Sequence, residues 1–173
     1  EAIRETLEIA RPGWRARVAQ PYPELTPLCD TIVVGGGVLA KAPRAGQAAL
    51  VVLDALQPIG ISTLVLDTYG LTPVLGNVVR VKPLAAVEAL DAGGLTNLGT
   101  VVAPVGEARP GDRVMTMNVR YEDGSELDID IRYGDLEILP LPLGKEAVLD
   151  LSPRRGFDVG LGGKGKKGKR RVS

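Results

Sequence analysis

The spacing of hydrophobic residues changes once along the chain, near residues 93–99. Before this point, short apolar runs alternate with segments of helical spacing, whereas from Thr100 onward apolar and polar residues alternate one by one. The first pattern is typical of an α/β structure and the second of antiparallel strands. We therefore predict an α/β segment over residues 1–98 and an antiparallel β domain over residues 99–159.

The α/β segment is expected to contain a βαβ unit. Residues 31–34 are a β-branched run that ends at three glycines, and residues 62–66 are a second apolar run that ends at Asp67. Pro43 is placed to open a helix over residues 44–56. Two strands joined by one helix over so short a distance are predicted to be buried and parallel, with a right-handed crossover.

Shorter helices are expected on either side of this unit. Apolar residues at helical spacing predict a helix over residues 1–10. Thr72 followed by Pro73 is typical of an N-cap followed by the first helical residue, and residues 83–90 form another short helical pattern.

Two alternating runs in the second half predict a hairpin and its register. Apolar residues occupy alternate positions on both sides of the sequence Glu122-Asp123-Gly124. A two-residue loop would place Tyr121 opposite Glu126, whereas a three-residue loop with Gly124 in the left-handed conformation pairs apolar with apolar residues. The three-residue loop predicts that Val119 pairs with Leu127, Met117 with Ile129 and Arg120 with Glu126.

The rest of the second half divides into strands and a tail. Strands are predicted over residues 100–105, 136–139 and 147–151, which with the hairpin would make a small antiparallel barrel or sandwich. From residue 160 onward the chain is rich in glycine and lysine and cannot bury a core. Residues 160–173 are therefore predicted to form a disordered basic tail.

Charge is balanced over the whole chain but unevenly distributed. The 173 residues include 21 Lys and Arg and 21 Asp and Glu. Six of the basic residues lie between Lys164 and Arg171, which leaves 15 basic against 21 acidic residues over residues 1–163. The tail could bind nucleic-acid phosphates or an acidic partner, or it could be a solubilising terminus. Aromatic residues make up 3% of the chain and are absent from the tail, which argues against a nucleic-acid partner.

Composition excludes several kinds of site. The chain has no histidine, which excludes His-based triads, histidine general bases and histidine metal ligands. The single cysteine, Cys29, cannot form an internal disulfide and fits a reducing compartment. No apolar run approaches the roughly 20 residues of a membrane helix, and the chain opens without a signal peptide or an initiator Met. We expect a cytoplasmic protein with no membrane partner, and a chain that is a piece of a longer one.

Two candidate binding elements follow the predicted strands. Gly35, Gly36 and Gly37 could let the backbone approach a ligand, or they could simply form a tight turn from strand to helix. Asp67 could hold a ribose or a metal-bound water, or it could accept hydrogen bonds from the backbone of the turn that it begins. We interpret a further set of carboxylates as the solvated face of the hairpin rather than as an acid/base pair or a Ca²⁺ site. These are Glu126, Asp128, Asp130, Asp135 and Glu137.

Longer stretches of the sequence resemble a known family. Residues 30–76, DTIVVGGGVLAKAPRAGQAALVVLDALQPIGISTLVLDTYGLTPVLG, are the main stretch, and LGTVVAPVG, YGDLEILPLPLG and RGFDVGLGGKG extend it over most of the chain. Together they resemble the glutamate mutase accessory proteins, called MutL or GlmL, which are not the mismatch-repair protein of the same name. This family is similar to the actin/Hsp70/sugar-kinase superfamily of ATPases, which has a ribonuclease H-like fold.

The resemblance implies a fold, a cofactor and a partner. Residues 1–98 would be the C-terminal part of an ATPase lobe, in which Gly35, Gly36 and Gly37 contact the adenosine of ATP. The whole protein would couple ATP binding or hydrolysis to a change in a B12-dependent mutase, such as the release of a damaged cofactor. The acidic, glycine-rich elements with which the superfamily binds phosphates and Mg²⁺ are missing from this sequence, so the chain alone is not expected to hydrolyse ATP. The alternative hypothesis is a stand-alone protein-interaction module without nucleotide binding.

Overall fold

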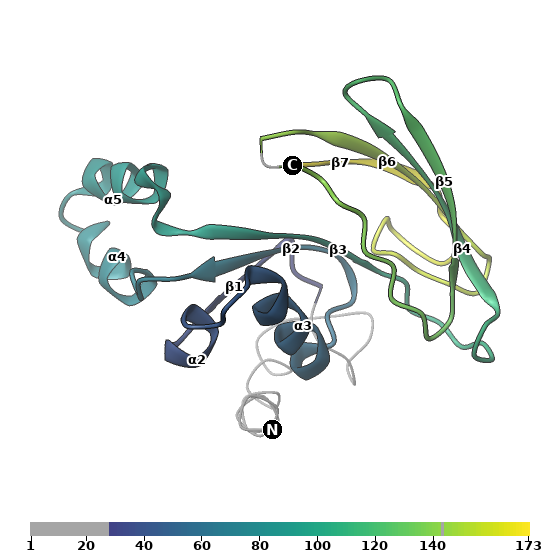
Figure 1. Ribbon diagram of the computed structural model, residues 1–173, viewed down its shortest axis with the longest axis horizontal. Coiled ribbons are helices and arrows are strands. Elements are labelled where there is room, and N and C mark those ends of the chain that lie inside the picture. Colours follow the sequence, from purple (N-terminus) through teal and green to yellow (C-terminus); the bar gives the residue numbers. More distant parts are fainter. Residues whose placement is uncertain (1–27, 143) are drawn as a thin grey trace. The chain divides into compact units, whose positions relative to one another are not determined.

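The computed structural model describes residues 28–142 and 144–173 (Figure 1). These residues form a mixed α/β structure with two sheets, in which the strand orders are β1-β2-β3 and β5-β4-β6-β7. The helix predicted over residues 1–10 lies outside the described residues.

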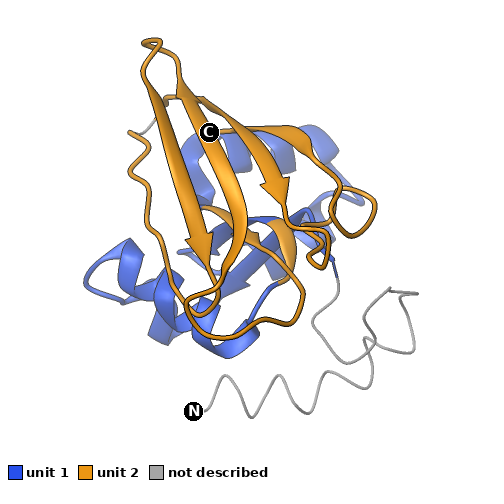
Figure 2. Ribbon diagram, turned by 90° about the vertical axis from the view of Figure 1, so that its right-hand side faces the viewer, with its two compact units in different colours: residues 1–58, 62–99 blue, residues 59–61, 100–173 orange. Residues whose placement is uncertain are grey.

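The chain divides into two compact units (Figure 2). Unit 1 comprises Ser62–Gly99 together with the described residues up to Pro58, and unit 2 comprises Ile59–Ile61 and Thr100–Ser173. The change of unit between Gly99 and Thr100 falls beside the segment where the hydrophobic spacing changes in the sequence.

Unit 1 contains the predicted βαβ unit. Strand β1 (Thr31–Gly35) pairs in parallel with β2 (Gly60–Asp67), which confirms the predicted strand direction. The chain between them forms the short helix α2 (Gly37–Ala40) and the longer helix α3 (Ala45–Leu56), which is drawn below the strand pair in Figure 1.

The apolar stripe of α3 explains why this segment is a helix. Four buried residues recur at the spacing of one helix face, and the residue after the helix takes the left-handed conformation that commonly ends a helix. That residue is Gln57, with φ of 46°, and its N–H donates to the Leu53 carbonyl at 2.9 Å. Pro58 then follows and cannot continue the helix. The buried stripe is Ala48, Val52, Ala55 and Leu56.

Strand β1 is more exposed than the sequence predicts. Its residues alternate between exposed and half-buried, and 45% of Val33 is accessible. The prediction of a buried strand is wrong for the part of the chain that the structure describes. The physical reason is its position at the edge of the sheet, because among residues 28–142 and 144–173 it pairs with β2 alone and part of its surface stays uncovered.

Two short helices separate β2 from the third strand of the sheet. Helix α4 (Thr72–Val78) and helix α5 (Pro83–Ala89) confirm the predicted helices, and η1 (Leu90–Gly94) extends the second. Strand β3 (Thr96–Ala103) then pairs with β2. The strand that we assign by sequence to residues 100–105 therefore begins earlier, because Gly93 at φ 86° ends the helical conformation before it. It belongs to the first sheet, in which it pairs with β2.

Unit 2 is built on the predicted hairpin. Strand β4 (Arg113–Tyr121) is antiparallel to β5 (Glu126–Arg132), and every pair predicted from the sequence occurs in its register. Gly124 has a φ of 82°, and the Tyr121 N–H donates to the Ser125 carbonyl at 2.9 Å. The three-residue loop is confirmed by this register, whereas a two-residue loop would set Tyr121 opposite Glu126.

The register also brings together an exposed ion pair whose contribution can be measured. The Arg120 Nε lies 2.8 Å from the Glu126 Oε1, and about half of each side chain is accessible. We expect a double-mutant cycle with Arg120→Ala and Glu126→Ala to give a coupling free energy below about 1 kcal/mol, since solvent screens exposed pairs. Urea unfolding of the four proteins measures it. A coupling near zero would show that the shape of the loop and the apolar pairs set the register without help from this pair.

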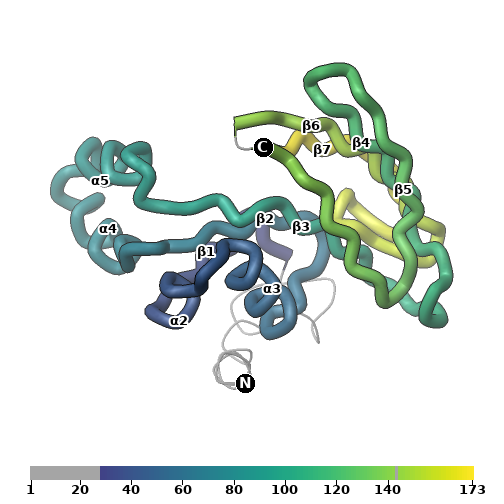
Figure 3. The backbone as a smooth tube through the Cα atoms, in the orientation of Figure 1, coloured from purple at the N-terminus to yellow at the C-terminus, as the bar shows by residue number. Residues whose placement is uncertain are grey.

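Two more strands complete the second sheet. Strand β6 (Ala147–Pro153) pairs with β4, and β7 (Gly168–Val172) pairs with β6 (Figure 3). Residues 136–139, predicted as a strand, have no regular secondary structure. The predicted disorder of residues 160–173 is corrected by β7, because the β6 edge supplies the backbone partners that glycine and lysine cannot supply for themselves. Neither sheet closes into a barrel within the described residues.

The second sheet buries one face and exposes the other. Alternate residues of β4 and β6 form the core, while the residues between them point to the polar face. Phe157 and Val159, from the chain after β6, pack into the same core. The strand part of the core is Val114, Met115, Met117, Val119, Ala147, Leu149 and Leu151.

Candidate functional site

The candidate site lies where the parallel strands β1 and β2 end. Gly35 is the last residue of β1 and stands beside Asp67, the last residue of β2, in the register. A Cβ built on Gly35 would lie 3.4 Å from the Asp67 Cβ and 3.9 Å from its Oδ2. The structure thus brings two of the sequence-predicted site residues together, and Gly35 leaves room for the carboxylate beside it.

The next two glycines expose their backbone. Gly36 has φ of 116° and ψ of 151°, a conformation that is essentially restricted to glycine, and it precedes α2. Gly37 begins α2. A Cβ built on either residue would meet nothing within 4 Å. The turn from strand to helix therefore needs glycine at position 36, whereas position 37 is glycine without a steric demand from the described residues.

Asp67 is a buried carboxylate whose two oxygens bind the chain itself. Its Oδ1 accepts from the Leu71 N–H at 2.8 Å, and its Oδ2 accepts from the Thr72 N–H at 2.8 Å and the Thr72 hydroxyl at 2.6 Å. Only 3% of the residue is accessible. The geometry supports the interpretation of Asp67 as the residue that starts and holds a turn, rather than as a ligand of a ribose or a metal-bound water.

These hydrogen bonds also fix the charge of Asp67. The side-chain and backbone donors of Thr72 are the main cause that holds the pKa of Asp67 below its ordinary value of 3.8, although burial acts in the opposite direction. Backbone donors of Leu71 and Gly70 lower the pKa further. Asp67 therefore places a negative charge at the start of α4, where the helix dipole also favours it.

The sequence did not identify the role of Thr72 correctly. We predict Thr72 as the N-cap of α4, but Leu71 holds that position and its side chain makes no cap hydrogen bond. Thr72 is instead the first helical residue, and its hydroxyl donates to Asp67. No local pattern in the sequence indicates this cap, because it forms only when the loop over residues 68–71 folds back onto Asp67.

A polar link and an aromatic ring lie in the segment after β2. The hydroxyls of Thr68 and Thr96 are 3.2 Å apart, which joins the end of β2 to the beginning of β3. Tyr69 exposes 74% of its surface in the loop between Asp67 and α4. An exposed aromatic ring can stack on a nucleobase, and composition alone does not single out this residue.

The acidic residues of the hairpin are paired with neighbours rather than gathered into a site. Asp128 accepts from the Asn118 amide at 3.0 Å, and Asp130 accepts from the Thr116 hydroxyl at 3.2 Å. In the part of the chain that the structure describes, no three His, Cys, Asp or Glu side chains are grouped so that they could hold a metal ion. The prediction of a solvated face of the hairpin is confirmed for Glu126, Asp128 and Asp130. Asp135 and Glu137 are also exposed, but they follow β5 and lie outside the strands of the hairpin.

Two further findings concern membrane-spanning helices and the comparison with known proteins. Among the described residues, no helix combines the length and the apolar character needed to cross a membrane. No protein-family model, no curated protein and no solved structure matches this sequence.

Proposed function

We propose that this chain forms the adenosine-side wall of an ATP site in an accessory protein of a B12-dependent mutase. The observation that carries the proposal is the open backbone of Gly36 and Gly37 at the carboxyl ends of two parallel strands. Ligands of α/β sheets bind at this edge, and glycines without side chains let a nucleoside approach the backbone. The resemblance of residues 30–76 to the glutamate mutase accessory family supports the same role.

The proposed site needs contacts that the described residues do not provide. ATP also requires groups that bind its phosphates and a metal ion, and the described residues have no cluster for a metal. Because the residues of β1 alternate between exposed and half-buried, we expect another part of a longer protein to cover this strand. We therefore expect the native polypeptide in its source cells to be several times heavier than 18.2 kDa. An intact mass near 18.2 kDa would contradict the ATPase proposal and leave the interaction module.

The decisive variant is Gly37→Val in the native polypeptide. A Cβ at Gly37 would meet nothing within 4 Å, so the fold should accept the side chain while the bound nucleoside would collide with it. We expect ATP binding, measured by isothermal titration calorimetry, to fall at least about 30-fold, since a side chain would replace contacts of the nucleoside with the backbone.

Gly46→Val is the matched control for this variant. Gly46 lies in the first turn of α3, and a Cβ there also meets nothing within 4 Å. The control should bind ATP as the wild type does. Equal binding by Gly37→Val and the wild type would exclude adenosine from this turn. Gly36→Val is less informative because the φ of 116° makes any side chain at that position strained.

A protein-interaction module without nucleotide is the second candidate, and the surface of α4 and α5 favours it. Val74 and Leu84 expose 57% and 70% of their surface, and Val81 between the helices exposes 80%. Exposed apolar patches of this kind mark interaction surfaces. An equilibrium ATP titration separates the candidates, because this module predicts that the native polypeptide binds no ATP.

A further inference from the structure

Two turns of unit 2 concentrate positive charge. Residues 154–156 follow β6, and residues 162–167 precede β7. The Gly165 N–H donates to the Phe157 carbonyl at 2.7 Å, and a Cβ built on Gly165 would lie 3.0 Å from the Arg155 Cα. The two turns therefore pack backbone against backbone. We call them the basic loop pair.

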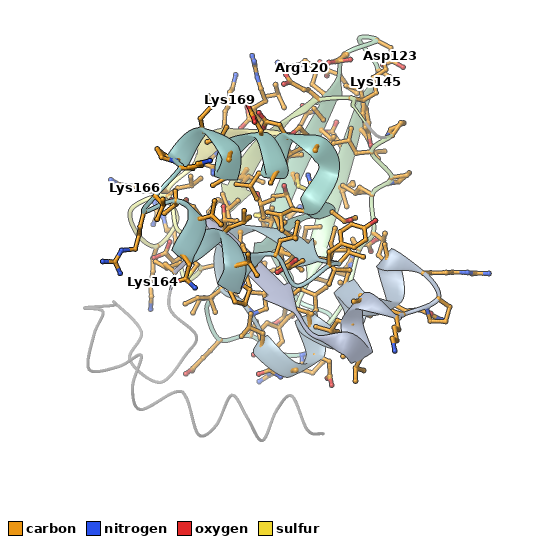
Figure 4. The ribbon with its side chains drawn as sticks, turned by 90° about the vertical axis from the view of Figure 1, so that its left-hand side faces the viewer. Arg120, Asp123, Lys145, Lys164, Lys166 and Lys169 are labelled. Atoms are coloured by element: carbon orange, nitrogen blue, oxygen red, sulfur yellow. The ribbon has the colours of Figure 1, made fainter. Side chains whose placement is uncertain are left out.

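The cations of the basic loop pair are exposed and have no carboxylate partner among the residues that the structure describes. Figure 4 shows Lys164 and Lys166 extending from the loop before β7. Because the chain as a whole is formally neutral, an anion would be attracted by this local cluster rather than by net charge. Among the described residues, the exposed cations of the two turns without an ion pair are Arg154, whose Nη1 donates to the Arg113 carbonyl, and Arg155, Lys164, Lys166 and Lys167.

The cations of β7 itself differ from those of the loop. Lys169 pairs with Asp150 at 3.7 Å, and Arg171 pairs with Glu146 at 3.5 Å. Lys169 and Arg171 therefore already have carboxylate partners, unlike the cations of the basic loop pair. The polar face of the sheet carries its charges largely in pairs of opposite sign, so a long polyanion laid across that face would gain little further attraction.

We propose that the basic loop pair is a docking surface for a short acidic segment of a protein partner. A compact cluster of exposed cations fits a few carboxylates, and the paired charges of the sheet face offer an extended phosphate backbone little further attraction. The loop 162–167 also has no aromatic ring on which a base could stack, which disfavours single-stranded nucleic acid. This surface lies in unit 2 and does not depend on nucleotide binding at the glycine turn.

The test uses a fluorescein-labelled peptide of ten glutamates and the full chain at low ionic strength. Fluorescence anisotropy gives the dissociation constant for the wild type and for the triple variant Lys164→Gln, Lys166→Gln, Lys167→Gln. We expect the triple variant to bind about tenfold more weakly, since each exposed charge contact contributes a small part of the affinity. Added salt should weaken wild-type binding, because the contacts are exposed.

A second triple variant controls for net charge. Lys41→Gln, Lys82→Gln and Arg109→Gln remove the same charge from exposed positions outside the loop that also have no carboxylate partner among residues 28–142 and 144–173, and they should change the affinity less than twofold. The proposal is overturned if the wild type does not bind the peptide, or if the two triple variants bind it equally. It is also overturned if a ten-nucleotide single-stranded DNA binds more tightly than the peptide at the same salt concentration.

Discussion

Replacing Asp67 with alanine is expected to lower the free energy of unfolding of unit 1 by about 2–3 kcal/mol. The substitution removes three hydrogen bonds at the start of α4 and leaves the N–H groups of Leu71 and Thr72 without their acceptor. Unsatisfied donors at a helix start cost stability, and this helix has no other side-chain cap. Urea unfolding followed by circular dichroism measures the change.

The same carboxylate predicts a dependence of stability on pH. Because the pKa of Asp67 is lower in the folded protein than its ordinary value of 3.8, its contribution is complete above that value. The contribution should be lost as the pH falls through the lower, folded pKa. Asp67→Asn is the matched control, since it keeps the shape but does not titrate in this range. If Asp67→Asn shows the same acid loss of stability as the wild type, another group is responsible.

Replacing Leu151 with alanine should have the larger effect, a loss of about 3–4 kcal/mol from the stability of unit 2. Leu151 has no accessible surface, and its strand lies between β4 and β7. Alanine would leave a cavity that the strands on both sides prevent from collapsing. Hydrogen exchange of the β4 and β6 amides, together with urea unfolding, would show the loss.

Val148→Ala is the control for this cavity. Val148 belongs to the same strand but lies on the opposite face and is half-buried, so its truncation should cost less than about 1 kcal/mol. Equal losses from Leu151→Ala and Val148→Ala would mean that the strand pairing, rather than the buried face, provides most of the stability of the sheet.

The parts of the fold that local chemistry determines were predictable from the sequence. The register of β4 and β5 follows from alternating residues and the glycine that the loop requires, so the pair of Val119 and Leu127 could be assigned in advance. The helix α3 was predictable for the same reason, because its apolar stripe and the proline after it act over a few residues.

Features that depend on distant parts of the chain were not predictable. Nothing local in Gly168–Val172 favours a strand, and its order comes from the edge of β6, which lies more than ten residues earlier. The exposure of β1 depends likewise on which strands pair with it. At the candidate site, the adjacency of Gly35 and Asp67 followed from the parallel pairing, whereas the cap formed with Thr72 depends on how the intervening loop folds back.

The order β5-β4-β6-β7 also determines what is complete while the chain is being made. Strands β4, β5 and β6 emerge from the ribosome before β7, and β4 lies between the other two. These three strands can therefore associate before β7 covers the free edge of β6. Until β7 emerges, the outer edge of β6 offers unpaired backbone groups to any other nascent chain. When β7 emerges it pairs with this edge of β6 and ends the period in which the sheet could aggregate during synthesis. The strand that covers the edge is cationic.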